Sequence, residues 1–184
     1  MDSSDITIRR LGSPGDLGWV VMAHGETYAA EFGWDRSFEA LVARIVADYA
    51  AAHDPSREAA WIAEAGGRRV GCVFCIAADQ STSQLRILLV DPKARGHGLG
   101  ARLVDECVAF AREAGYERLR LWTNHPLTAA RRIYLARGFT LLSEDPHHSF
   151  GVDLIGQVYE LDLRHDYGAL ARSPSRAPGA TTTR

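Results

Sequence analysis

The sequence has no long apolar run, little cysteine and no excess of charge of either sign. No apolar segment approaches the roughly eighteen residues of a membrane-spanning helix, so such a helix is excluded. The first residues, Met1-Asp2-Ser3-Ser4-Asp5, lack the basic and then apolar pattern of a secretory signal. The chain has 3 cysteines, and an odd number cannot form a closed set of disulfides, which favours a reducing cytoplasm.

The charge balance excludes two classes of partner. The chain carries 21 Lys and Arg against 23 Asp and Glu, a formal net charge of −2. A nucleic-acid binder that relies on a basic surface would show a clear positive excess, so we expect neither nucleic acid nor membrane as a partner. The length of 184 residues and the hydrophobic content of 46% are those of one packed domain.

Hydrophobic periodicity predicts an α/β chain in the order β-α-α-β-β-β-α-β-α-β-β. Such an order indicates a mixed central sheet of about seven strands with helices on both faces. The expected strands are 5–10, 58–65, 68–77, 84–90, 118–123, 139–143 and 157–163, and the expected helices are 16–32, about 38–53, 98–114 and 127–137. We expect residues 144–156 to be a loop, residues 5–164 to be a single domain, and residues 168–184 to be a disordered tail rich in Ser, Pro and Thr.

A glycine-rich loop between a strand and a helix is the most informative segment. It reads Arg95-Gly96-His97-Gly98-Leu99-Gly100-Ala101, directly after the strand that ends at Val90 and the turn Asp91-Pro92. Glycines let a backbone approach a ligand, and the N-terminus of a helix offers free N–H groups and a partial positive charge. The loop therefore predicts a phosphate or pyrophosphate site, to which Arg95 and Arg102 can add charge-assisted bonds.

Two common phosphate motifs do not fit this loop. A P-loop requires Lys-Ser or Lys-Thr after its last glycine, and neither is present. The spacing Gly96-x-Gly98-x-x-Ala101 matches a dinucleotide fingerprint, but that motif expects an acidic residue at the end of the next strand. Here the next strand ends Trp122-Thr123-Asn124.

A third pattern fits better. Arg95-x-x-Gly98-x-Gly100 resembles the pyrophosphate loop of the GNAT superfamily of N-acetyltransferases, and Asn124, Ala130, Tyr134 and Gly138-Phe139 resemble its second signature. The resemblance covers about residues 5–163. His24-Gly25, residues 28–34 and residues 148–151 also resemble the acetyltransferase half of MarR–GNAT fusion proteins, of which this chain would be a stand-alone version.

The resemblance implies an acetyl-CoA-dependent N-acetyltransferase in which a primary amine attacks the donor directly. The strand 87–90 would splay from its neighbour, and the pantetheine arm would bind in the gap. The implied cofactor-binding residues are Leu88, Leu89, Val90, Arg95, Gly96, His97, Gly98, Leu99, Gly100, Ala101, Asn124, Ala130 and Tyr134. The implied acceptor-binding residues are His24, Tyr28, Glu31, Trp34 and His148.

Tyr134 is the candidate general acid, because a phenol with a pKa near 10 is protonated at neutral pH. The general base is open. Residues 84–90 contain no acid, so we expect Glu31, which shares a helix face with His24 and Tyr28, while His148 and a water relay are alternatives.

The leading expectation is acetylation of the primary amine of a small molecule. Two alternatives remain open: acetylation of a protein or peptide, and non-catalytic acyl-CoA binding. A homodimer is compatible with each. We expect no metal site: Cys72 and Cys75 lie three residues apart in a predicted strand and would face opposite sides of the sheet.

Overall fold

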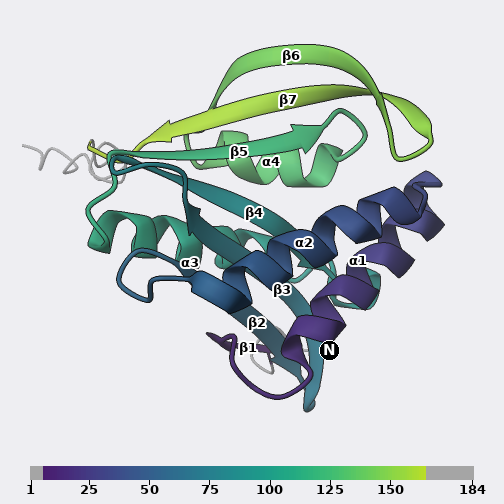
Figure 1. Ribbon diagram of the computed structural model, residues 1–184, viewed down its shortest axis with the longest axis horizontal. Helices are drawn as coiled ribbons and strands as arrows, with labels where there is room; N and C mark the ends of the chain where they lie inside the picture. Colours follow the sequence, from purple (N-terminus) through teal and green to yellow (C-terminus); the bar gives the residue numbers. More distant parts are fainter. Residues whose placement is uncertain (1–5, 165–184) are drawn as a thin grey trace, which may run out of the picture.

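The computed structural model describes residues 6–164, and the expected tail at 168–184 lies outside them. These residues form one seven-stranded mixed sheet with helices on both faces, as the periodicity predicts (Figure 1). The elements are β1 (Ile6–Arg10), α1 (Asp16–Phe32), α2 (Arg36–Ala52), β2 (Ala59–Ala65), β3 (Arg68–Ala77), β4 (Thr82–Val90), the short 3-10 helix η2 (Pro92–Ala94), α3 (Leu99–Glu113), β5 (Arg118–Asn124), α4 (Thr128–Ala136), β6 (Thr140–Ser149) and β7 (Val152–Asp162). None of the helices in this part of the chain is long and apolar enough to span a membrane.

The sheet has one parallel pair of neighbours, and that pair lies at its centre. The strand order is β1-β2-β3-β4-β5-β7-β6, and β4 and β5 run parallel while the other neighbours run antiparallel. The connection from β4 to β5 contains α3, because parallel neighbours need a crossover. The loop that precedes α3 therefore lies at the carboxyl end of β4.

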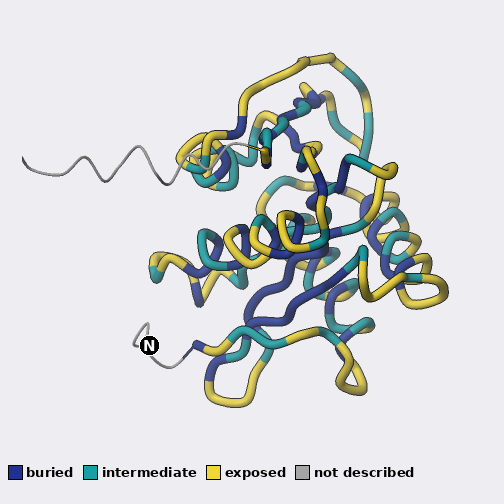
Figure 2. Tube along the Cα trace, turned by 90° about the vertical axis from the view of Figure 1, so that its left-hand side faces the viewer, coloured by how far each residue is buried: buried dark blue, intermediate teal, exposed yellow. Residues whose placement is uncertain are grey.

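Each face of the sheet has its own hydrophobic core. The helices α1 and α2 pack on one face through residues such as Val20, Phe38 and Val42. The helices α3 and α4 pack on the other face, where Leu103 and Tyr134 join the core. The strands β2 and β3 between these helices are almost entirely buried, and Figure 2 shows dark blue strands at the centre of the molecule.

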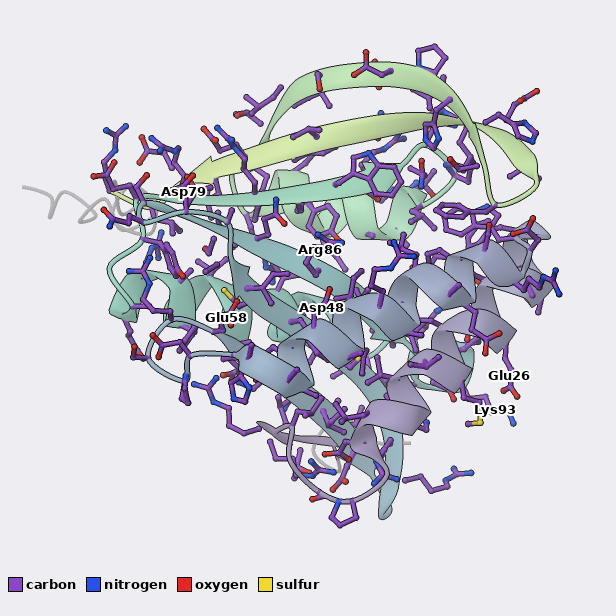
Figure 3. All side chains as sticks on the ribbon, in the orientation of Figure 1. Glu26, Asp48, Glu58, Asp79, Arg86 and Lys93 are labelled. Atoms are coloured by element: carbon purple, nitrogen blue, oxygen red, sulfur yellow. The ribbon has the colours of Figure 1, made fainter. Side chains whose placement is uncertain are left out.

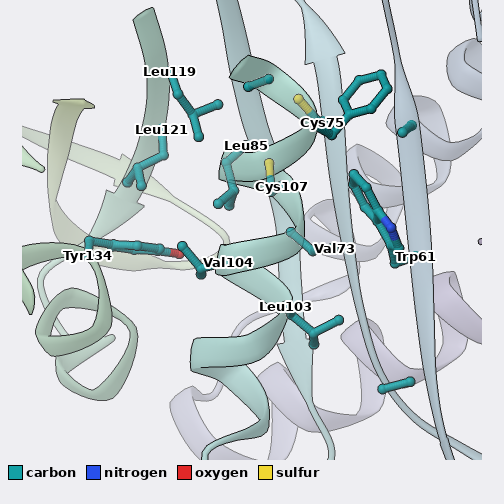
Figure 4. Close-up of a cluster of buried hydrophobic side chains, with 14 of the residues drawn as sticks. Trp61, Val73, Cys75, Leu85, Leu103, Val104, Cys107, Leu119, Leu121 and Tyr134 are labelled. Atoms are coloured by element: carbon teal, nitrogen blue, oxygen red, sulfur yellow. The ribbon is translucent and has the colours of Figure 1, made fainter. Parts of the chain in front are cut away.

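The two cysteines of the Cys-x-x-Cys sequence lie on opposite faces, which confirms the prediction from strand geometry. Cys72 belongs to the core under α1 and α2, and Cys75 belongs to the core under α3. Figure 4 shows Cys75 beside Cys107 of α3 in this second core, close to Trp61 and Leu85. All three cysteines are buried free thiols.

The prediction of a loop at residues 144–156 is wrong. These residues extend β6 and β7 into a long hairpin that turns at Phe150-Gly151, both of which have positive φ (57° and 79°). The full length of β6 could not be predicted from hydrophobic alternation, because this edge strand is almost entirely exposed and polar (Figure 2). Pro146 is tolerated there because an edge strand has one side without a ladder.

An ionic cluster fixes the start of α1 against the sheet. The carboxylate of Asp16 is 1% exposed and accepts bonds from Arg9 of β1 and Arg69 of β3, at 2.8 Å and 2.7 Å. It also accepts the backbone N–H groups of Gly12 and Ser13. The bond from Arg9, together with these other donors, holds the pKa of Asp16 well below its ordinary value despite burial.

Candidate active site

The glycine-rich loop opens the N-terminus of α3 toward solvent. Gly96 and Gly98 have positive φ (84° and 71°), and a Cβ at either position would meet nothing within 4 Å. Gly98 is the N-cap of α3, and the first N–H groups of a helix have no partner within the helix. The loop thus presents unpaired donors and a positive helix end to an open space, which is the arrangement that binds phosphate oxygens.

The two arginines that flank the loop differ in what they contact. Arg95 donates to the carbonyl of Val90 at 3.2 Å and forms an ion pair with Glu31 of α1 at 2.7 Å. Arg102 points away from the loop and donates to the carbonyl of Ile6 on β1 at 2.9 Å. Only Arg95 can therefore assist the loop, and the expectation for Arg102 is wrong because Arg102 ties α3 to the edge strand.

A cavity of about 480 Å³ lies beside this loop. Its wall contains ten of the thirteen residues expected to bind the cofactor. These are Leu88, Leu89, Val90, Arg95, Gly96, Gly98, Leu99, Gly100, Ala101 and Ala130. His97, Asn124 and Tyr134 are not in this wall, and the His97 ring instead bonds to the carbonyl of Arg95 at 2.9 Å. We call this space the donor cavity.

The strands β4 and β5 separate beside the donor cavity, as the family resemblance implies. Their pairing ends at Leu85 and Leu121, while β4 continues to Val90. A bulge in β4 accompanies the separation. Between the pairs Cys72–Leu89 and Phe74–Arg86, β3 advances by two residues and β4 by three, and Ile87 has a φ of 44°. The backbone of β4 beyond Leu85 is therefore free of a neighbour on the β5 side, and it can accept a ligand as an added strand would.

A second cavity of about 230 Å³ lies on the other side of this gap. It is lined by residues of α1, α2, β4, β5 and α4, and we call it the acceptor cavity. Its wall includes three of the five residues expected to bind the acceptor: His24, Tyr28 and Trp34. The two cavities share Tyr28, Leu88, Leu127 and Ala130, so they meet at the point where the strands separate.

Tyr134 lines the acceptor cavity close to this junction. Its side chain is 4% exposed and packs against the rings of Phe139 and Tyr159, at centroid distances of 5.7 Å and 6.5 Å. Burial raises the pKa of Tyr134 well above its ordinary value, and Tyr28 adds to the effect. The phenol therefore holds its proton throughout the physiological range.

His24 is buried in α1, and its Nε2 has no hydrogen-bond partner among the described residues. Its Nδ1 lies 2.8 Å from the carbonyl oxygen of Val20, which can only accept, so Nδ1 carries the proton in the neutral ring. Burial lowers the pKa of His24 to about 4, although the carbonyls of Val20 and Ile87 partly oppose this effect. The ring is therefore neutral at pH 7, and it stacks on Tyr28 with ring centroids 5.9 Å apart.

The other candidate residues lie further from the junction. Glu31 lines the donor cavity, paired with Arg95. Asn124 lines the acceptor cavity, and its side-chain oxygen lies 3.0 Å from Nε2 of His147. His148 is exposed on β6 and pairs with Asp153 at 2.7 Å, so the structure brings it into neither cavity.

Sequence reasoning missed several residues of the acceptor cavity, chiefly Arg86, Trp122 and Phe38. Arg86 carried a usable signal, because it is the only charged residue in the strand segment 84–90. Trp122 and Phe38 have no sequence feature that indicates a binding role, since each occupies an ordinary apolar position of a strand or a helix.

Comparison with known proteins identifies the family. Residues 19–139 match the description of the acetyltransferase (GNAT) family. The chain belongs to this family. Membership of the family confirms the expected GNAT fold.

Curated GNAT relatives are similar over parts of the chain. An uncharacterised N-acetyltransferase of Schizosaccharomyces pombe is 30% identical over 143 residues, which cover 76% of this chain and 85% of that protein. The mycothiol acetyltransferase of Beutenbergia cavernae is 30% identical over 86 residues, 47% of this chain. The match spans only 28% of the length of that relative.

Solved GNAT structures share the fold. A protein of Salmonella typhimurium solved with its cofactor acetyl-CoA superimposes with a TM-score of 0.72 at 19% identity, over 96% of this chain and 99% of that one. A GNAT acetyltransferase of Elizabethkingia anophelis, with acetyl-CoA bound, gives a TM-score of 0.58 at 16% identity and covers 86% of this chain and 98% of its own. The narrower resemblance to MarR–GNAT fusions is not tested by these matches and stays a prediction.

Proposed function

We propose that this enzyme transfers an acetyl group from acetyl-CoA to the primary amine of a small molecule. The observation that carries the proposal is the meeting of two cavities at Tyr28, Leu88, Leu127 and Ala130, where β4 and β5 separate. The acceptor cavity has a volume of about 230 Å³, which suits a small molecule better than a folded protein surface.

The chain's own groups suit each part of the donor. The free N–H groups of residues 98–101 and the guanidinium of Arg95 would bind the pyrophosphate. The backbone of Leu88 to Val90, which has no neighbour on the β5 side, would hold the pantetheine arm as a neighbouring strand would. When bound, acetyl-CoA supplies the acetyl group as a thioester, and the group passes to the amine nitrogen while the sulfur leaves with a proton.

We propose Tyr134 as the residue that delivers this proton. Tyr134 lines the acceptor cavity, and its hydroxyl stays protonated because burial raises its pKa. The hydroxyl forms no hydrogen bond within the described residues, so its proton is not engaged elsewhere. A positioned acid of this kind contributes about 10²- to 10⁴-fold to a rate.

We propose Glu31 as the group that accepts the proton from the amine, through water. The pair with Arg95 at 2.7 Å fixes its carboxylate on the wall of the donor cavity, one helical turn from Tyr28. The same pair gives Glu31 a second role, since it also holds Arg95 beside the glycine-rich loop.

A broad amine panel with acetyl-CoA and thiol detection tests the proposed function. We expect thiol release that depends on a small amine, with the N-acetylated amine as the product. Release with peptides but with no small amine would replace the proposal by peptide acetylation. Tight binding of coenzyme A with no release at all would replace it by a non-catalytic binding role.

A further inference from the structure

The acceptor cavity contains one charged side chain, Arg86. This residue lies in β4 opposite Phe74 of β3, and Phe74 belongs to the core under α1 and α2. Arg86 therefore points to the α2 side of the sheet, where it lines the acceptor cavity. Figure 3 shows it in the space between α2 and β5.

Arg86 lacks the acidic partner that other arginines of the sheet have. Arg9 pairs with Asp16, and Arg120 pairs with Glu160. Within residues 6–164, the only hydrogen bond from the Arg86 side chain goes to the neutral Oε1 of Gln84, at 3.2 Å. Burial lowers the pKa of Arg86, which is the sign of a cation that has lost water without gaining a counter-charge.

The rest of the acceptor cavity supplies no negative charge. No Asp or Glu of the described chain lies in its wall, and His24 is neutral at pH 7. The remaining wall is mainly aromatic and aliphatic: Tyr28, Trp34, Phe38, Leu41, Val42, Ile45 and Trp122. A polyamine or another cationic acceptor would meet repulsion from Arg86 and no carboxylate to bind it.

We propose that Arg86 binds a carboxylate of the acceptor, and that the enzyme acetylates apolar amino acids or closely similar amino carboxylates. The inference rests on the proposed function, because it names the substrate class of the same cavity. The carboxylate would pair with the guanidinium, which forms strong charge-assisted bonds to planar anions. The apolar side chain would pack among Trp34, Phe38 and Trp122, and the amine would face the junction.

Matched pairs of amines that differ only by the carboxylate test this proposal. We would compare L-phenylalanine with 2-phenylethylamine, and L-leucine with 3-methylbutylamine, by kcat/KM at saturating acetyl-CoA. The wild-type protein should prefer the amino acid of each pair by roughly 10- to 100-fold, the range of a hydrogen bond to a charged group. Arg86→Gln should remove the preference, and Arg86→Lys should keep part of it.

Arg44→Gln is the control variant. Arg44 lies on the exposed face of α2 and lines neither cavity, so its loss removes the same charge without touching the acceptor. Thermal unfolding of each variant would show whether it folds. The proposal is overturned if the wild-type protein uses the decarboxylated amines equally well or better, or if Arg86→Gln leaves the preference intact.

Calorimetry separates this proposal from the proposed function. The same ligands would be titrated into protein saturated with coenzyme A, where no acetyl group is present to transfer. We expect the amino acids to bind, the decarboxylated amines to bind at least about 10-fold more weakly, and Arg86→Gln to abolish the difference. If the amino acids bind as expected but are not acetylated, the proposed function is contradicted and the role of Arg86 is upheld. If amines are acetylated but the amino acids bind no better than the decarboxylated amines, the role of Arg86 is contradicted and the proposed function is upheld.

Discussion

Replacement of Tyr134 by phenylalanine removes one hydroxyl from a residue that lines the acceptor cavity. The aromatic packing against Phe139 and Tyr159 stays, since it involves only the ring. The hydroxyl has no hydrogen-bond partner in the described structure, so we expect the free energy of unfolding to change by less than about 1 kcal/mol. The variant therefore tests chemistry separately from folding.

The expected kinetic effect follows from the leaving group. General acids contribute about 10²- to 10⁴-fold, but an ordinary thiol has a pKa near 8.5, and its anion can leave with little help. The effect should lie at the low end, so we expect kcat to fall by about 10- to 100-fold. This corresponds to a rise of about 1.4 to 2.7 kcal/mol in the activation barrier.

Thiol release is a clean assay for this variant because Cys72, Cys75 and Cys107 are all buried and should not react with a thiol reagent in the folded protein. The dissociation constant for acetyl-CoA, measured separately, should stay unchanged. Since burial raises the pKa of Tyr134 above its ordinary value of 10.0, its ionisation should not reduce the wild-type rate below about pH 10. An unchanged kcat would refute the role of Tyr134 as the general acid. A loss of activity that is explained by weaker binding of acetyl-CoA would show that Tyr134 has a structural role instead.

Three further predictions concern the loop, the base and the ionic cluster. Gly98→Ala should weaken coenzyme A binding by at least about 10-fold, because its Cβ enters the open space beside the loop. Gly67→Ala, at a similar φ of 74°, is the control: it should cause the same backbone strain of about 1 kcal/mol without affecting binding. Equal affinities of the two variants for coenzyme A in a titration would contradict this prediction. Glu31→Gln should lower kcat and raise the KM for acetyl-CoA, and a change in KM alone would limit Glu31 to positioning Arg95. Asp16→Asn should reduce the free energy of unfolding at pH 7 by about 2 to 3 kcal/mol, since it breaks a buried ion pair. The folded pKa of Asp16 is lowered, so this stabilisation is present above its ordinary pKa of 3.8 and lost as pH falls below it; a difference between the two proteins that persists in full at pH 2 would contradict the argument.

The position of the glycine-rich loop could be predicted from the sequence because local chain geometry determines it. The loop from Arg95 to Gly100 lies between a strand and a helix, as expected, and Gly96 and Gly98 adopt positive φ, which glycine tolerates. The separation of β4 and β5 was expected from the family resemblance, and the register confirms it. The loop residues are close in the chain, whereas the separation involves two strands that the chain connects through α3.

The acceptor side depends on contacts between distant segments, which periodicity does not report. Arg86 and Trp122 line one cavity although they belong to different strands, and α2 completes its wall. The strand β6 was missed for a related reason: an exposed edge strand needs no apolar alternation, so its polar sequence is typical of a loop. The ion pair between Glu31 and Arg95 likewise joins residues from two separate elements.

The central claim is acetyl transfer to a small amine at the junction of the two cavities. The most direct measurement is mass spectrometry of reactions that contain wild-type enzyme, isotopically labelled acetyl-CoA and L-phenylalanine or L-leucine. The account predicts labelled N-acetyl amino acid in amounts equal to the thiol released, and at least about 10-fold less product with Tyr134→Phe at equal acetyl-CoA occupancy. Bound acetyl-CoA without a labelled product from these or any other small amine would contradict it.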